Sequence, residues 1–164
     1  MQVLDDRQIR QKIRRLAIEI MEHNCDEQEL ILAGINNRGM AFARLLFAEL
    51  QRISKQAISL TQIRVNPADP LATEVVLDMP IEGLSGKAVI VVDDVANTGR
   101  TIFYACKPLL ETLPKKIEVA VMVDRTHKSF PVKVDYFGIS LATTLLENID
   151  VQIPENQAFG VFLN

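Results

Sequence analysis

The sequence contains no tryptophan, and it has only two cysteines and two histidines. Cys25 and Cys106 lie far apart, and His23 and His127 are also isolated from one another, so none of them has the spacing of a metal-ligand set. This pattern argues against a zinc site and against a disulfide-stabilised scaffold. We expect both cysteines to be ordinary reduced thiols, as is usual in the cytosol.

Long apolar runs and an excess of one charge are also missing. No apolar run reaches the ~18 residues that cross a bilayer, and the opening MQVLDDRQIRQK lacks the apolar core of a signal peptide. The formal net charge is −3, so the overall field does not attract nucleic acid or an anionic membrane. The sequence therefore predicts a cytoplasmic protein with no membrane partner.

The composition is that of a globular domain. Hydrophobic residues make up 48% and charged residues 24% of the 164 residues, which suits one domain with a sizeable core. No repeat, low-complexity tract or linker divides the chain. We therefore expect a single domain over residues 1–164.

The first predicted element is an amphipathic helix. Ile9, Ile13 and Leu16 recur at helical spacing, and Asp5 or Asp6 can cap the helix. Its opposite side is basic, and we interpret it as a solvated face, the alternative being an RNA-binding face. The basic residues are Arg7, Arg10, Arg14 and Arg15.

Strands and helices alternate along the rest of the chain. Strands are predicted at 29–35, 57–65, 73–78, 87–92, 117–123, 133–139 and 158–163, the last at a sheet edge. Helices are predicted at 39–53 and 99–112, where Pro108 should kink the helix or end it early. This alternation predicts an α/β fold with a mostly parallel central sheet flanked by helices.

Polar clusters follow three of the predicted strands: NNRG at 36–39, DDVANTGRT at 93–101 and DRTHK at 124–128. In an open α/β sheet, ligands bind beyond the carboxyl ends of the strands, near a topological switch point. We therefore expect the three clusters to contribute to one site.

The segment VIVVDDVANTGRT, residues 89–101, has the features of a phosphate site. Gly99 can adopt a positive φ and bring backbone N–H groups together, and a helix is predicted to begin there. Thr98 and Thr101 add hydroxyl donors. Arg100 either adds positive charge or points to solvent. The other common phosphate motifs, GxxxxGK[ST] and GxGxxG, are absent from the sequence.

The acidic pair in the same segment needs a different partner. Asp93 and Asp94 would repel a phosphate, but they suit a pair of sugar hydroxyls, or Mg²⁺ and its waters. A ribose 5-phosphate satisfies both halves of the segment. The weaker alternative is a capped strand-to-helix turn in which the two aspartates are merely solvated.

An apolar strand, an acidic pair and a TGxT turn together resemble the ribose-phosphate signature of type I phosphoribosyltransferases. ILAGINNRGMAFARLL (31–46) looks like the pyrophosphate loop of these enzymes and its helix. VMVDRTHKSFPVKVDYFGI (121–139) looks like the base-side segment of the bifunctional pyrimidine operon regulator/uracil phosphoribosyltransferase family, and 3–24 resembles its first helix. The resemblance covers nearly the whole chain and implies a small hood and flexible loop region beside the central sheet.

The resemblance implies an enzyme of nucleotide salvage. It would transfer the 5-phosphoribosyl group of 5-phosphoribosyl-1-pyrophosphate (PRPP) to a nucleobase, with uracil favoured, using Mg²⁺ and releasing pyrophosphate. It also implies a homodimer or larger homo-oligomer. The alternatives are a nucleotide-sensing, RNA-binding pyrimidine regulator, a purine phosphoribosyltransferase, and a slow homologue that binds PRPP.

Two departures from related patterns separate these alternatives. Asn97 and Asp124 stand where 6-oxopurine enzymes usually have Asp and Lys, which disfavours a purine substrate. Ile18 and Ile139 are apolar where the regulators use basic or polar residues for RNA. RNA is therefore a possible partner but not the favoured one.

The resemblance also assigns residues to roles. The catalytic candidates are Asp93, Asp94 and Arg38. The candidates for the ribose 5-phosphate are Asp93, Asp94, Ala96, Asn97, Thr98, Gly99, Arg100 and Thr101. Those for pyrophosphate are Asn36, Asn37, Arg38, Gly39 and Arg64, and those for the base are Asp124, Arg125, Tyr136 and Phe137. Mg²⁺ would be held mainly by PRPP and waters, with Asp93 and Asp94 as the protein candidates.

Three of these assignments have structural alternatives. Asp124 and Arg125 can form a purely structural ion pair. Tyr136 and Phe137 lie in a predicted strand, where burial in the core is expected for at least one of them. The loop at 65–72 either closes over the site or is an ordinary connection between strands.

Overall fold

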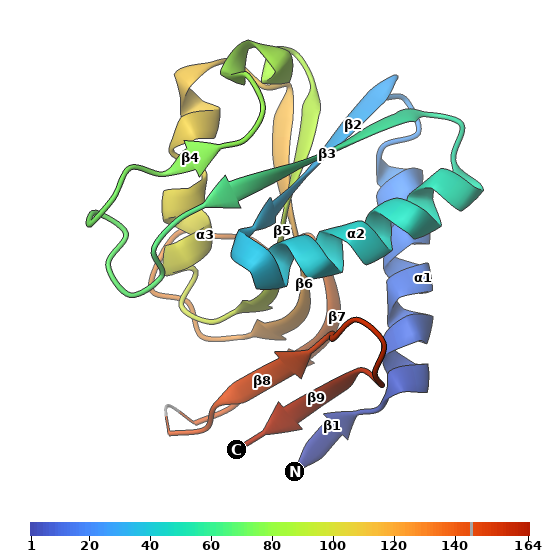
Figure 1. Cartoon of the computed structure of the whole chain (residues 1–164), viewed down its shortest axis with the longest axis vertical. Helices are drawn as coiled ribbons and strands as arrows, with labels where there is room; N and C mark the ends of the chain where they lie inside the picture. The colour runs from blue at the N-terminus through green and yellow to red at the C-terminus, as the bar shows by residue number, and fades with distance from the viewer. Residues whose placement is uncertain (145) are drawn as a thin grey trace.

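The computed structural model describes residues 1–144 and 146–164, which form two sheets and their flanking helices (Figure 1). The main sheet has the order β4-β3-β2-β5-β6-β7, and the small sheet has the order β1-β9-β8. The main-sheet strands are β2 (Glu29–Ile35), β3 (Ala57–Arg64), β4 (Val76–Leu77), β5 (Ala88–Ala96), β6 (Lys116–Arg125) and β7 (Tyr136–Leu141). The small sheet consists of β1 (Gln2–Leu4), β8 (Ile149–Gln152) and β9 (Gly160–Leu163).

The main sheet is parallel except at β4, which pairs antiparallel with β3. The helices are α1 (Asp6–His23), α2 (Asn36–Ile53) and α3 (Arg100–Ala105), with 3₁₀ turns at Ile81–Leu84 and Pro108–Glu111. The predicted α/β fold is therefore confirmed. Among the described residues, no helix is long and apolar enough to cross a membrane.

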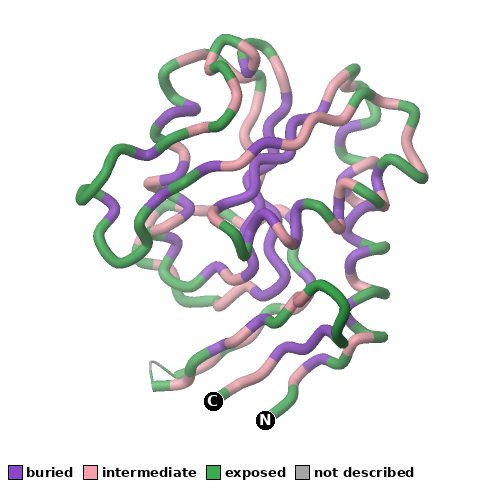
Figure 2. The backbone as a smooth tube through the Cα atoms, in the orientation of Figure 1, coloured by how far each residue is buried: buried purple, intermediate pink, exposed green. Residues whose placement is uncertain are grey.

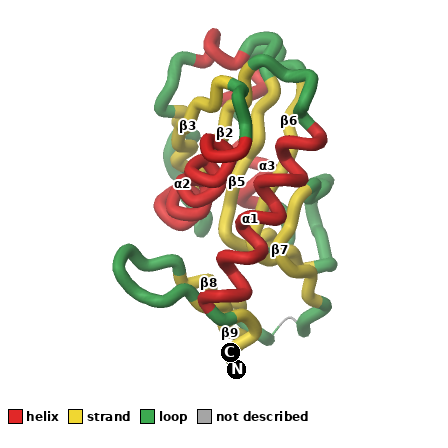
Figure 3. The backbone as a smooth tube through the Cα atoms, turned by 90° about the vertical axis from the view of Figure 1, so that its right-hand side faces the viewer, coloured by secondary structure: helices red, strands yellow, loops and turns green. Residues whose placement is uncertain are grey.

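The core has two halves, one on each face of the main sheet. Helices α1 and α2 cover one face, and their buried residues join those of the small sheet in a single apolar cluster (Figure 3). Helix α3 and the 3₁₀ turns cover the other face. The middle strands are buried on both faces (Figure 2), and this explains why 29–35 and 87–92 read as continuous apolar runs.

Several local predictions are confirmed, and others need correction. Asp5 caps α1 in a capping box with Gln8. Pro108 begins a 3₁₀ turn, so the predicted helix at 99–112 ends at Ala105. Strand 158–163 was placed wrongly: β9 pairs with β1 and β8 in the small sheet, not at the edge of the main sheet. The segment at 73–78 contributes only the two residues of β4.

The start of α2 packs unusually close to the main sheet. A Cβ atom added to Gly39 would lie 2.6 Å from the Val92 carbonyl oxygen and 3.3 Å from Asp93 Oδ1. A Cβ atom on Gly34, at the end of β2, would lie 2.6 Å from the Met40 Cα atom. Glycine at these positions brings the NNRG cluster against the acidic pair on β5.

We expect Gly39→Ala to destabilise the protein by about 1–3 kcal/mol, because the added methyl group overlaps backbone atoms that cannot move aside. Alanine normally favours a helix over glycine, so a loss of stability would be specific to this contact. Urea unfolding measures the effect. Gly83→Ala is the matched control, since its Cβ would meet only the flexible end of Met79; equal effects of the two substitutions would contradict this explanation.

Candidate functional site

The polar clusters predicted from the sequence meet at the carboxyl edge of the main sheet. Arg38, in the first turn of α2, has its guanidinium 3.6 Å from the Asp94 carboxylate on β5. Both residues line a pocket of about 400 Å³ that the small sheet closes from the other side. The lining residues are Asn37, Arg38, Ala41, Asp94, Asp150, Val151, Gln152, Ile153, Pro154 and Gln157.

The two aspartates are not equivalent. Strand β5 runs to Ala96 and includes both aspartates, which therefore do not lie in a loop after the strand. As neighbours in a strand, their side chains point to opposite faces of the sheet. Both residues are buried, and Asp93 Oδ1 accepts the backbone N–H of Asp94 at 2.9 Å. Burial, together with the neighbouring Asp94 charge, raises the pKa of Asp93 well above its usual value. Asp94 is the carboxylate that faces the pocket.

The TGRT turn has the backbone expected of an anion-binding loop. Gly99 has φ = 87°, in the left-handed region that glycine adopts without strain. Residues 95–102 line a hollow of about 40 Å³. The Thr98 carbonyl accepts the N–H groups of Ser129 and Phe130, which fix the turn from outside. Helix α3 has only six residues, so binding of an anion would depend on the converging N–H groups and hydroxyls more than on a helix dipole.

Arg100 connects this turn to the loop at 65–72. Its guanidinium donates to the carbonyls of Pro67 at 2.6 Å and Ala68 at 3.4 Å. It therefore neither adds its charge directly to the turn nor points freely to solvent. The contact holds the 65–72 loop beside the predicted phosphate site.

Of the five predicted pyrophosphate residues, two line the pocket. Asn37 and Arg38 line the pocket, whereas the Asn36 side chain binds both the N–H and the carbonyl of Val65. Asn36 has φ = 52°, an uncommon conformation for a non-glycine residue, and strain of this kind is frequent at functional sites. Arg64 pairs with Asp78 at 2.9 Å at the β3–β4 end of the sheet.

The acidic and basic residues after β6 do not pair with each other. Asp124 binds Lys128 Nζ at 2.7 Å. The Arg125 guanidinium donates to the Asn97 side chain, to the Thr143 hydroxyl, and to the carbonyls of Thr144 and Glu147. Four of its five N–H donors are therefore engaged. The alternative of an Asp124–Arg125 ion pair is wrong, and Arg125 instead joins Thr143, Thr144 and Glu147 to Asn97 at the start of the TGRT turn.

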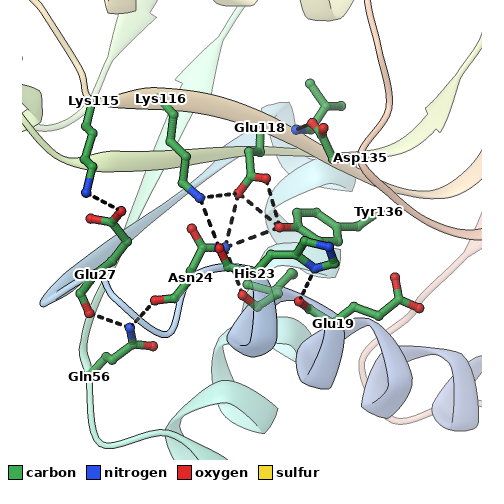
Figure 4. A network of polar contacts seen from close by, with 12 residues as sticks. Glu19, His23, Asn24, Glu27, Gln56, Lys115, Lys116, Glu118, Asp135 and Tyr136 are labelled. Carbon is green, nitrogen blue, oxygen red and sulfur yellow. Dashed lines mark hydrogen bonds and ion pairs between the residues drawn. The ribbon is translucent and has the colours of Figure 1, made fainter.

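The ring of Tyr136 does not reach the pocket. Tyr136 is 1% exposed, and its hydroxyl lies 3.0 Å from both carboxylate oxygens of Glu118 (Figure 4). Asn24 also donates to this hydroxyl. Burial and the Glu118 carboxylate raise the Tyr136 pKa. Tyr136 therefore meets the expectation that at least one of the two aromatics is buried in the core, and its side chain is not available to stack on a base. Phe137 is 41% exposed, and its base contact stays a prediction.

Two residues near the site were given no role of their own in the sequence analysis. Asp150, on β8, accepts a hydrogen bond from Arg38 at 3.1 Å, and Lys128 neutralises Asp124. Lys128 was within reach of sequence reasoning, because it follows Asp124 by four residues in a turn. Asp150 was not, since neither β8 nor its position beside α2 was predicted.

The donor set at this edge suits Mg²⁺ bound together with a phosphorylated substrate. Mg²⁺ usually takes one or two carboxylates and completes its shell with waters and phosphate oxygens. Asp94 offers such a carboxylate to the pocket. Asp93 does not line this pocket.

Comparison with known proteins defines the class. A model of the phosphoribosyl transferase domain matches residues 1–156, and the chain belongs to this family. Curated relatives are named bifunctional protein PyrR. The one from Streptococcus uberis is 35% identical over 157 residues, which cover 94% of this chain and 90% of that protein. The one from Bacillus pumilus is 33% identical over 165 residues, with 93% and 90% covered. The predicted family resemblance is confirmed.

Solved structures support the fold. A hypoxanthine phosphoribosyltransferase from Trypanosoma cruzi superposes with a TM-score of 0.73 at 18% identity, covering 85% of this chain and 81% of that one. A hypoxanthine-guanine phosphoribosyltransferase from Bacillus anthracis gives a TM-score of 0.71 at 20% identity, with 85% and 81% covered. At these identities the match concerns the fold and not the substrate.

We expect Asp93→Asn to stabilise the protein by about 1 kcal/mol at pH 7.5. The neutral amide avoids the cost of burying a carboxyl group that is ionised in the unfolded chain, and it keeps the oxygen that accepts the Asp94 N–H. The folded-state pKa of Asp93 is raised, so the wild type loses stability as the pH rises from about 4 through that pKa. The gain should therefore vanish near pH 4. Urea unfolding at both pH values measures it, with the exposed Asp26→Asn as control. A variant less stable than wild type at pH 7.5 would contradict this prediction.

We expect Tyr136→Phe to destabilise the protein by about 1–2 kcal/mol, because Glu118 and Asn24 lose a buried hydrogen-bonding partner. Substrate KM should stay within about two-fold, since the ring lies outside the pocket. Thermal unfolding and steady-state kinetics separate the two effects, and Tyr104→Phe on α3 is the control. A large rise in KM at unchanged stability would contradict this prediction and indicate that Tyr136 contacts the substrate.

Proposed function

We propose that the protein is a Mg²⁺-dependent phosphoribosyltransferase that transfers the 5-phosphoribosyl group of PRPP to a nucleobase, with uracil favoured. One observation carries the proposal: the pocket-facing Asp94, the anion-binding turn and Arg38 converge at one edge of the sheet. These three features suit the ribose hydroxyls, the 5-phosphate and the diphosphate of PRPP. Its place is pyrimidine salvage in the cytoplasm, as a homodimer or larger homo-oligomer.

The reaction exchanges one bond at the anomeric carbon of the ribose for another. The bond to the pyrophosphate oxygen breaks, and a bond to the base nitrogen forms as that nitrogen loses its proton. The residues at 96–101 hold the 5-phosphate. The Asp94 carboxylate accepts hydrogen bonds from the ribose hydroxyls and stabilises the positive charge that develops on the ring. Arg38 attracts the departing pyrophosphate. Bound Mg²⁺ would neutralise charge on the leaving group, with Asp94 as its protein candidate.

The base side of the site supports a pyrimidine more than a purine. Asn97 is turned toward Arg125 by a 3.2 Å hydrogen bond. Asp124 is already neutralised by Lys128, and neither residue supplies the side chain that 6-oxopurine enzymes usually have there. Asp124 and Phe137 remain the candidates for contacts with the base.

The alternative of RNA binding finds less support. On the basic face of α1, Arg10 pairs with Asp6, Arg14 with Glu49, and Arg15 with Glu19. Each pairing reduces the positive charge available for phosphates. A regulator would show RNA affinity with a steep salt dependence, which filter binding at two salt concentrations measures.

The test is pyrophosphate release from PRPP and Mg²⁺, with uracil, hypoxanthine, guanine and orotate supplied separately. We expect release with uracil. Asp94→Asn should lower kcat/KM by about 100-fold, because it removes a charge that acts on the reacting ring. Asp26→Asn, at the opposite end of the sheet, is the control and should be unchanged.

Release with a purine alone would overturn the pyrimidine assignment. Release with none of the four bases would overturn the transferase proposal and favour a nucleotide-sensing role. Full activity of Asp94→Asn would overturn the role assigned to the acidic pair.

A further inference from the structure

Arg38 is already engaged by two carboxylates that come from different sheets. Its Nη1 lies 3.1 Å from Asp150 Oδ1 and 3.6 Å from Asp94 Oδ2. Asp94 belongs to β5 of the main sheet and Asp150 to β8 of the small sheet. All three residues line the same pocket. The guanidinium therefore joins the two sheets at the mouth of the site.

The charge balance at this mouth is unfavourable for an anion. Gln152 Nε2 donates to Asp150 Oδ2 at 2.7 Å, and this bond together with Arg38 lowers the Asp150 pKa. Asp150 is therefore ionised at neutral pH. With Asp94 it offsets the single positive charge of Arg38, so an arriving diphosphate must compete with Asp150 for the guanidinium.

We propose that Asp150 is a positioning residue that holds Arg38 at the pocket mouth before substrate binds and releases it to the diphosphate group of the substrate. The proposal rests on the proposed function in one respect, that a diphosphate binds in this pocket. It adds a residue of the small sheet to the site and gives it a defined action: competition with the substrate for one cation.

The exposure of the pair makes the exchange feasible. The Arg38 side chain is 66% exposed and that of Asp150 is 26% exposed, and ion pairs in such surroundings are weak. A diphosphate carries more negative charge than one carboxylate and can accept several guanidinium N–H groups at once. Its arrival would also break the Arg38–Asp150 link between α2 and β8.

The test is calorimetric titration with inorganic pyrophosphate in the presence of Mg²⁺, which requires no turnover. Asp150→Asn should tighten pyrophosphate binding by about two- to five-fold, the range expected for removal of an exposed competing ion pair. Asp150→Glu keeps the competing carboxylate and should restore weaker binding. Glu155→Gln removes the same charge from the following loop, at a residue that does not line this pocket, and should change the affinity by less than about 1.5-fold.

The same substitution made in an Arg38→Gln variant separates competition for Arg38 from simple charge repulsion. In Arg38→Gln, the further change Asp150→Asn should tighten binding less than it does in the wild type, because there is no guanidinium left to release. In turnover, Asp150→Asn should lower KM for PRPP by a similar factor with kcat nearly unchanged.

Equal or weaker pyrophosphate binding by Asp150→Asn would overturn the proposal, and so would an undiminished gain in the Arg38→Gln background. If the wild type binds pyrophosphate but transfers to no base, the transferase proposal fails while the Asp150 comparison still decides this one. Absence of binding by the wild type and by Asp150→Asn would overturn both.

Discussion

The close approach of α2 to β5 is the constraint on which the site depends. There is no space for a side chain between Gly39 and the Val92 carbonyl, so the first turn of α2 lies directly against the acidic pair. This contact brings Arg38 to Asp94. At the start of the same turn, Asn36 adopts a left-handed conformation and binds the Val65 backbone. A looser packing would separate the cation from the carboxylate and leave two unrelated surface clusters.

The same packing determines the electrostatics of the acidic pair. Asp93 is covered by the start of α2 and favours its neutral form, whereas Asp94 keeps its carboxylate toward the pocket. Burying Asp93 beside a second buried carboxyl group lowers the stability of the protein at neutral pH, and of the two only Asp94 lines the pocket. Two adjacent, chemically identical side chains therefore differ in position: Asp94 lines the pocket and Asp93 does not.

The main sheet, and the position of the polar clusters at its carboxyl edge, could be predicted because both are encoded locally. Continuous apolar runs indicate strands that are buried on both faces. Gly99 indicates a positive φ in the TGRT turn, and the structure has φ = 87° there. The small sheet could not be found in this way. Strands β1, β8 and β9 are three or four residues long, and their pairing joins the two ends of the chain. Asp150 was missed for that reason. The hydrogen-bonding partners of Tyr136, Asn24 and Glu118, could not be predicted because they are distant from it in the sequence.

The central claim is that the turn at 97–101 holds the 5-phosphate of a ribose whose hydroxyls face Asp94. Titration of isotope-labelled protein with ribose 5-phosphate, followed by amide chemical shifts, tests it most directly. The account predicts saturable shifts at the amides of 97–101 and of Asp94 and Val95, with the shifts at 97–101 largely retained in Asp94→Asn. Shifts confined to the basic face of α1, or no saturable shift at the turn, would contradict it.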